Sequence, residues 1–128
     1  MKRHSGLLVS LIIGAALGAG AVQALHAAAT PPGFVVAEID VTNADAYQKE
    51  YAPLTKQILV GGGGTYLVRG GKTTGIDGEP PKNRIAIVQF ESVDKALAVY
   101  NSQAYRDARK IGEKYAKFRV YAVEGVTP

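Results

Sequence analysis

The sequence predicts an α+β domain with the order β-α-β-β-α-β, preceded by an N-terminal export segment. Three observations support this fold class: four short runs rich in β-branched and aromatic residues, two apolar stripes with helical spacing, and glycine or proline clusters between them. We expect an export segment over residues 1–29 and one domain over residues 30–128, a length typical of a single domain.

The export segment has the three parts of a signal peptide. A basic start, Lys2-Arg3, precedes an uncharged stretch at residues 7–25, and small residues follow it. Cleavage is expected after Ala27 or Ala29, which predicts an exported bacterial protein, periplasmic or secreted. The alternative is an uncleaved anchor, because the apolar stretch of about 19 residues is close to the length that spans a bilayer. Membrane contact would then be confined to this segment.

The first half of the domain is predicted to form a strand, a helix and a second strand. Residues 34–41 form a β-rich run, and Thr42 or Asn43 can cap the helix that follows. Pro53 predicts a kink or a restart of this helix near Ala52. The apolar stripe of the helix is formed by Tyr47, Tyr51, Leu54 and Ile58. The glycine run 61–64 ends the helix, and residues 65–69 are the second strand.

The second half repeats this alternation after a loop. Residues 72–83 are loop-like, although Thr73-Thr74 could add a short edge strand, and residues 84–91 are the third strand. Ser92 is expected to cap the second helix, and Ser102 to cap its continuation after a break. Residues 118–124 form the last strand.

This order is the ferredoxin-like arrangement, with two helices on one face of an antiparallel four-stranded sheet. Such a sheet usually has one polar face, but residues 84–91 are apolar at both alternating sets of positions. Something must therefore cover the second face. We expect a homodimer in which the two sheets pack face to face, because two-fold pairing is the commonest closed symmetry.

The composition excludes many chemistries. The chain has no Cys or Trp, its only Met is Met1, and its only His are His4 and His26. The absence of Cys rules out disulfides, thiolate nucleophiles, and Fe–S and structural zinc sites, and the absence of His from residues 30–128 excludes a Ser-His-Asp triad. We expect no metal site and no cofactor. Carboxylates, Lys, Arg, Tyr and hydroxyls remain for chemistry.

The charge pattern does not indicate a nucleic-acid partner. The net charge is +4, of which Lys2 and Arg3 in the export segment supply two, and no run of Lys and Arg exceeds two residues. A nucleic-acid surface needs a basic stripe, and the sequence shows none.

Polar residues within the apolar strands and helices are the candidate site. Glu38 and Gln89 lie in strands expected to be central, and a buried carboxylate must be paired or hydrogen-bonded, for which Arg69 is an available partner. Either Glu38 and Arg69 form a structural pair, or Glu38 is a general base or ligand contact. Tyrosines either pack in the core or line a pocket. The pocket candidates are Glu38, Tyr47, Tyr51, Tyr66, Arg69, Gln89 and Tyr100.

Several segments together resemble one protein family. They are Val35–Tyr47 with Glu50-Tyr51, Gly63–Gly71, Pro80-Pro81, Val88–Phe90, Ala98–Tyr105 and Val123–Val126. The chain is thereby similar to the family called domain of unknown function 1330. This resemblance implies membership of the dimeric α/β-barrel superfamily, but no established reaction. Related branches include cofactor-free monooxygenases, haem-degrading enzymes and dye-decolorising peroxidases, and the haem branches usually depend on His.

Three hypotheses for function follow. The first is an exported, homodimeric domain that binds a small, partly apolar molecule. The second is a cofactor-independent enzyme of oxygenase or isomerase type, with Glu38 as base and Arg69 or a tyrosine stabilising charge. The third is a non-catalytic envelope or stress-related protein.

Overall fold

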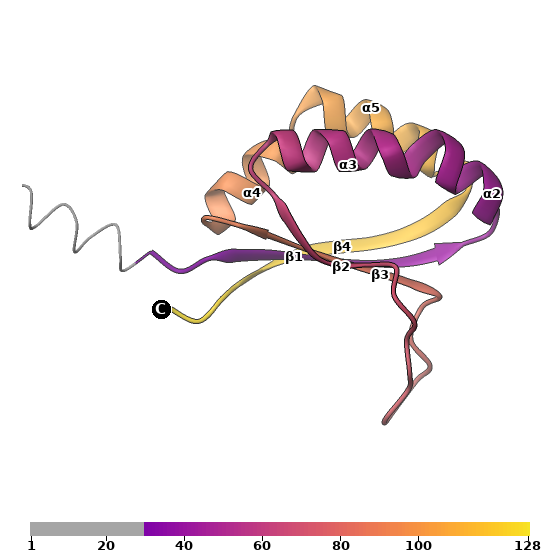
Figure 1. The fold of residues 1–128 in the computed structure, drawn as a ribbon, viewed down its shortest axis with the longest axis horizontal. Helices are drawn as coiled ribbons and strands as arrows, with labels where there is room; N and C mark the ends of the chain where they lie inside the picture. Colours follow the sequence, from indigo (N-terminus) through magenta and orange to yellow (C-terminus); the bar gives the residue numbers. More distant parts are fainter. Residues whose placement is uncertain (1–29) are drawn as a thin grey trace, which may run out of the picture. The chain divides into compact units, whose positions relative to one another are not determined.

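Four antiparallel strands and two helical regions form the domain, which confirms the predicted α+β, ferredoxin-like class (Figure 1). The structure is a computed structural model that describes residues 30–128, so the predicted cleavage sites Ala27 and Ala29 lie outside the described residues. The elements are β1 (Gly33–Val41), α2 (Ala44–Ala46), η1 (Tyr47–Tyr51), α3 (Ala52–Gly61), β2 (Thr65–Arg69), β3 (Arg84–Phe90), α4 (Val93–Tyr100), α5 (Gln103–Gly112) and β4 (Ala116–Glu124).

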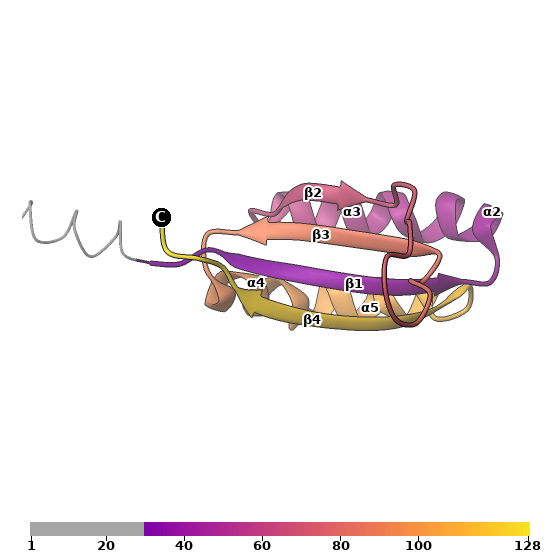
Figure 2. The ribbon, with the colours of Figure 1, turned by 90° about the horizontal axis from the view of Figure 1, so that it is seen from below.

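The sheet has the strand order β2-β3-β1-β4, and all the helices lie on one of its faces (Figures 1 and 2). The register places Ala37 of β1 between Ala86 of β3 and Val120 of β4. Residues directly opposite each other on paired strands have their side chains on the same face, so these three residues point to the same side. We call the side under the helices the covered face and the other side the open face.

The helix starts follow the predicted caps. The side chains of Asn43, Ser92 and Ser102 each accept a hydrogen bond from a backbone N–H three residues later. A cap of this kind satisfies one of the four N–H groups that a helix start leaves unpaired. These short polar side chains therefore fix where α2, α4 and α5 begin.

The helical region before Pro53 is wound as a π-helix. The Ala52 N–H bonds to the Tyr47 carbonyl, five residues earlier, instead of to the fourth. Pro53 has no N–H and its ring crowds the carbonyl four residues before it, so a regular helix cannot pass through this point. The restart predicted near Ala52 is thus present, and the π-helix precedes it. Tyr47 and Tyr51, the first and last residues of this segment, are both 3% exposed.

The structure differs from the prediction at Thr73-Thr74 and at the start of the last strand, while β1 and β3 differ from it by one residue each. No strand forms at Thr73-Thr74, because the chain between β2 and β3 contains Gly70, Gly71, Gly75, Gly78 and Pro80-Pro81 and forms no ladder with β2. The last strand begins at Ala116 rather than at residue 118, since β1 pairs with it as far as Val41. Within residues 30–128, no helix has the length and apolarity needed to cross a membrane.

The core lies between the covered face and the helices. Val35 and Ile39 of β1 and Val88 and Phe90 of β3 are each 2–3% exposed on this side. The open face is different, because Tyr121 and Val123 of β4 keep 42% and 49% of their surface exposed. Helices bury one side of the sheet, and within residues 30–128 no element covers the other.

Candidate functional site

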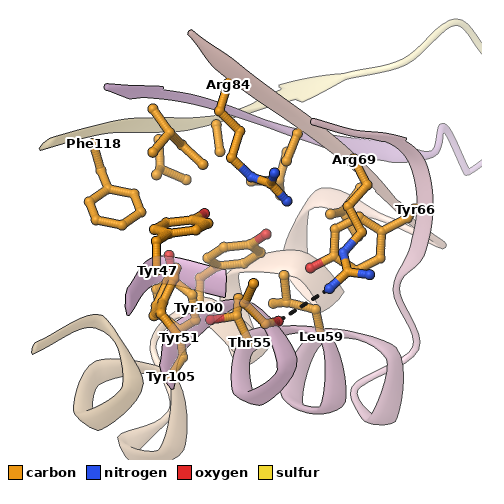
Figure 3. Close-up of a pocket in the computed structure, with 17 residues that line it drawn as sticks. Tyr47, Tyr51, Thr55, Leu59, Tyr66, Arg69, Arg84, Tyr100, Tyr105 and Phe118 are labelled. Atoms are coloured by element: carbon orange, nitrogen blue, oxygen red, sulfur yellow. Dashed lines mark hydrogen bonds between the residues drawn. The ribbon is translucent and has the colours of Figure 1, made fainter. Parts of the chain in front are cut away.

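A cavity of about 40 Å³ lies in this core, between the sheet and the helices (Figure 3). Its walls contain apolar side chains from β1, β3, β4 and α3, including Ile39, Leu59, Val88 and Phe118. Polar side chains also reach it from every helical region and from two strands. They are Tyr47, Tyr51, Thr55, Tyr66, Arg69, Arg84, Tyr100 and Tyr105. The cavity is therefore an apolar space with many hydrogen-bonding groups at its edge.

The winding of the first helical region brings three of these groups together. Tyr47, Tyr51 and Thr55 follow one another at intervals of four residues along η1 and α3, so they share the side that faces the sheet. Gly112 of α5 lies behind the Tyr51 ring, because a Cβ at this glycine would stand 2.8 Å from that ring. Glycine at this position lets α5 pack directly on Tyr51.

An irregularity in β2 places Tyr66 and Arg69 on the same face. Tyr66 is paired with Val88 and Arg69 with Ala86, with a register shift between Tyr66 and Val68. In a regular strand, residues three apart point to opposite faces, whereas an extra residue resets the alternation. The shift therefore turns Arg69 towards the cavity. Arg69 is more exposed than the other residues that line the cavity, so the cavity meets solvent at Arg69.

Each of the two arginines at the cavity lies over a tyrosine ring. The Arg69 Cζ is 5.3 Å from the centroid of Tyr66, and the Arg84 Cζ is 5.2 Å from the centroid of Tyr47. Arg69 Nη2 also donates to the Ala52 carbonyl at 3.3 Å. Stacking on an aromatic face stabilises a guanidinium without neutralising its charge. Both heads are held at the cavity with their positive charge intact.

Gly70 makes room for the Arg84 head. Its φ of 70° lies in the left-handed region, its N–H donates to the Ile85 carbonyl at 2.8 Å, and a Cβ at this position would collide with the Arg84 guanidinium. Only glycine adopts this conformation without strain and leaves the space free. The turn after β2 thus positions an arginine on β3.

The tyrosine hydroxyls of the cavity remain protonated at neutral pH. Burial raises the pKa of Tyr47 to about 12, even though the nearby Arg84 lowers it. Burial also raises the pKa values of Tyr51, Tyr66, Tyr100 and Tyr105. Each of these groups is a neutral hydroxyl that can donate or accept a hydrogen bond, and none is a base near pH 7.

The family of the chain follows from its sequence. Residues 32–126 match the family described as Domain of unknown function (DUF1330). The chain belongs to this family. No curated protein matches it.

Solved structures share the fold of this DUF1330 chain. An RPA0582 protein of unknown function from Rhodopseudomonas palustris is 17% identical, with a TM-score of 0.61 over 77% of this chain and 85% of that one. The methylated RPA0582 protein is 16% identical, with a TM-score of 0.62 over 77% and 84%. A protein of unknown function from Bacteroides thetaiotaomicron, described as a possible oxidoreductase, is 10% identical, with a TM-score of 0.49 over 75% of this chain and 99% of that one. At these identities, the first two matches show the fold alone.

The structure brings together five of the seven predicted pocket residues of the DUF1330 domain. Tyr47, Tyr51, Tyr66, Arg69 and Tyr100 line the cavity. Glu38 and Gln89 do not, because each stands between two residues that point to the covered face. Both therefore point to the open face.

The predicted pairing of Glu38 with Arg69 is wrong. Glu38 lies opposite Arg119 of β4, whose Nε is 3.3 Å from Glu38 Oε2. Arg69 is on the covered face, so the sheet separates the two side chains. The alternation of Val35, Ala37 and Ile39 already indicated that Glu38 faces away from them.

Three polar lining residues were missing from the predicted set: Thr55, Arg84 and Tyr105. Arg84 could have been predicted from the sequence, because it lies an even number of residues before Val88 and Phe90 in the same strand and so points to the same, buried side. Thr55 could have been predicted as well, since it continues the four-residue spacing of Tyr47 and Tyr51. Within residues 30–128, no group of three His, Cys, Asp or Glu side chains is arranged to hold a metal ion.

Proposed function

We propose that this domain binds one small, partly apolar molecule in the cavity between the sheet and the helices. The observation that carries the proposal is the convergence of polar side chains on a space with apolar walls, the usual composition of a ligand site. A volume of about 40 Å³ is several times the ~10–15 Å³ that one water needs. The space therefore suits a ligand, or a ligand end, of a few non-hydrogen atoms.

The lining favours binding over catalysis. A general base near pH 7 is a carboxylate, a His, or a Lys or Tyr with a lowered pKa. The polar lining consists of tyrosines with raised pKa values, one threonine and two arginines. The enzyme hypothesis used Glu38 as base and Arg69 as stabiliser, and these two lie on opposite faces of the sheet. A binding experiment distinguishes our proposal from the third hypothesis, a non-catalytic protein that binds no ligand.

The expected affinity is modest because the ligand is small. The best tiny ligands gain at most about 1.5 kcal/mol per non-hydrogen atom. Four such atoms then correspond to a Kd no tighter than about 40 μM. Detection therefore needs a method that reports weak binding, such as ligand-observed NMR.

The test uses a set of neutral and charged fragments of up to six non-hydrogen atoms, screened by ligand-observed NMR. We expect several fragments to bind, and Ala86→Leu, which fills the cavity from β3, to abolish their signals. A second hollow of about 760 Å³ lies on the outer side of α3 and α5 and includes Ala104, so Ala104→Leu is the matched control. Loss of binding in Ala104→Leu but not in Ala86→Leu would overturn the proposal.

The fold of Ala86→Leu needs its own check, because overpacking costs about 1–3 kcal/mol. Thermal unfolding shows whether the variant is folded. Ala37→Val adds less volume from β1, the neighbouring strand, and is the second variant. Ala37→Val should weaken the same fragments without unfolding the chain.

We also propose that the open face packs on a second copy of the chain. Val36, Ile87, Tyr121 and Val123 lie on this face, and the helices cover none of them. Sedimentation of the purified chain should show a dimer that Ile87→Glu dissociates, whereas Leu97→Glu on exposed α4 leaves it intact. A monomeric wild-type chain at 100 μM would contradict this. This test concentration is chosen because it is of the order of the dissociation constant of a weak dimer.

Export remains part of the proposal. The sequence pattern of residues 1–29 supports it. Intact mass of the protein purified from its own bacterium should correspond to an N-terminus just after Ala27 or Ala29. A mass that includes Met1 would favour the uncleaved anchor instead.

A further inference from the structure

We infer that the ligand of the cavity is a small carboxylate with a short apolar body, held by Arg69 and Arg84. The inference rests on the proposed function, since it names the chemical class that this cavity binds. Four observations support it: the charge balance of the lining, the buried Arg84 Nε that has no hydrogen-bond partner among the described residues, the approach of both heads to the same cavity, and the shape and polarity of the space.

The lining carries two positive charges and no negative one. Arg69 and Arg84 are its charged members, and none of its seventeen residues is Asp or Glu. Among the described residues there are four ion pairs, and neither arginine takes part in any of them. A charge taken partly out of water is costly unless an opposite charge accompanies it. A bound anion would supply that charge.

One donor of the Arg84 head is buried without a hydrogen-bond partner among the described residues. A guanidinium has five N–H donors, and the unpartnered one is at Arg84 Nε. Arg69 is more exposed, donates to the Ala52 carbonyl at 3.3 Å and lies within reach of the Tyr66 hydroxyl, so the unmet buried donor belongs to Arg84. Buried donors without partners are rare in folded proteins, and one that borders a cavity indicates a missing acceptor.

The two heads reach the same space from neighbouring strands. Figure 3 shows Arg84 extending from the sheet into the cavity and Arg69 entering it from the side, with tyrosine hydroxyls around them. Gly70 and the irregularity in β2 are what allow both arginines to reach inward. Both heads therefore border the same small space.

The polarity of the walls favours a carboxylate over phosphate or sulfate. Leu59, Val88 and Phe118 form apolar walls that a fully polar tetrahedral anion would leave without contacts. A carboxylate is planar, accepts two parallel hydrogen bonds from a guanidinium fork, and carries its charge at one end of a carbon body. The small volume limits that body to a few carbons.

The test compares acetate with acetamide, which have nearly the same shape but differ in charge. The purified chain is titrated with each compound at pH 7 in halide-free buffer, and binding is followed by the backbone amide chemical shifts. We expect acetate to bind at least about tenfold more tightly than acetamide, as charge-assisted hydrogen bonds require. Sodium chloride should compete with acetate, and sodium phosphate should bind more weakly than acetate.

Arginine variants test whether acetate binds at the cavity. Arg84→Gln should weaken acetate at least about tenfold, and Arg84→Lys, which keeps the charge but loses the fork, should weaken it by less. Arg106→Gln is the matched control, because Arg106 is exposed on α5 and lies outside the cavity. It should leave acetate binding within twofold of wild type, well below the tenfold effect.

The outcomes separate this inference from the proposed function. If acetamide binds as well as acetate, or if both Arg84 variants leave acetate binding unchanged, the inference is wrong while the binding proposal stands. The inference is equally wrong if phosphate binds more tightly than acetate. If neither probe nor any fragment binds, both proposals are wrong. Acetate binding that Arg84→Gln and Ala86→Leu both remove supports both.

Discussion

The two faces of the sheet use arginine in opposite ways. On the covered face, Arg69 and Arg84 border a cavity and form no ion pair among the described residues. On the open face, Arg119 lies 3.3 Å from Glu38, a partner from the neighbouring strand. The comparison indicates that the role of an arginine in this sheet depends on whether an acidic side chain of the chain lies beside it. A paired arginine has its counter-charge within the chain, whereas an unpaired one at a cavity needs a counter-charge from outside.

The apolar residues of the two faces differ as well. Phe90 of β3 is 2% exposed under the helices, while Val123 of β4 is 49% exposed on the open face. The covered face packs against the helices around one small cavity, whereas no helix or strand of residues 30–128 packs on the apolar surface of the open face. The proposals for a ligand and for a second copy therefore concern different sides of one sheet and can be tested separately.

The largest expected effect is a loss of stability when a side chain of the buried core is truncated. Phe90→Ala should lower the free energy of unfolding by about 3–5 kcal/mol, because it removes a buried ring and leaves a cavity. Val123→Ala, on the open face, should lower it by less than about 1 kcal/mol. Urea unfolding over a series of protein concentrations separates chain stability from association. Equal losses for the two variants in the dilute limit would refute the contrast between the faces.

An intermediate effect comes from the buried tyrosines at high pH. The folded-state pKa of Tyr47 is about 12, above its usual value of 10.0, so the folded chain retains a proton that the unfolded chain releases. Stability is then constant below about pH 10 and falls as the pH rises towards 12, by about 1.4 kcal/mol per pH unit for each such tyrosine.

Urea unfolding between pH 9 and pH 12 measures this slope, a range set by the pKa of Tyr47. Tyr47→Phe should reduce the slope, and Tyr121→Phe, at an exposed tyrosine of the open face, should keep the wild-type slope. A wild-type chain whose stability is the same at both ends of this range would show that burial does not hold these protons.

The smallest effect is expected for the ion pair of the open face. The Arg119 side chain is 76% exposed and that of Glu38 is 29% exposed, so solvent screens their attraction. Glu38→Gln should therefore change the stability by no more than about 1 kcal/mol. It should also leave acetate binding unchanged, since Glu38 lies across the sheet from the cavity. A loss of acetate binding in this variant would mean that the two faces are coupled.

Much of the fold follows from local sequence, while the site depends on pairing between distant strands. The caps at Asn43, Ser92 and Ser102 are local, because each acts three residues along the chain. Tyr47 and Tyr51 were found for the same reason, since helical spacing places them on one side. The element order and the helix starts could therefore be predicted from the sequence.

The partners of polar strand residues could not be found in this way. Arg119 meets Glu38 only through the register of β1 with β4, and Arg69 turns inward only through a shift in the pairing of β2 with β3. A shift of one residue moves a side chain to the other face of a sheet. Local sequence does not determine such a shift. The Glu38–Arg69 pair was predicted incorrectly because the register of the strands was not known from the sequence.

The most direct test of the central claim is the NMR signal of the Arg84 Nε–H, identified by its loss in Arg84→Gln. This donor is buried and has no partner among the described residues. Our account predicts that acetate shifts this signal until the site is saturated, while acetamide leaves it in place and the Arg119 signal does not move with either compound. An Arg84 signal that stays unmoved by acetate, or that moves equally with acetamide, would contradict the account.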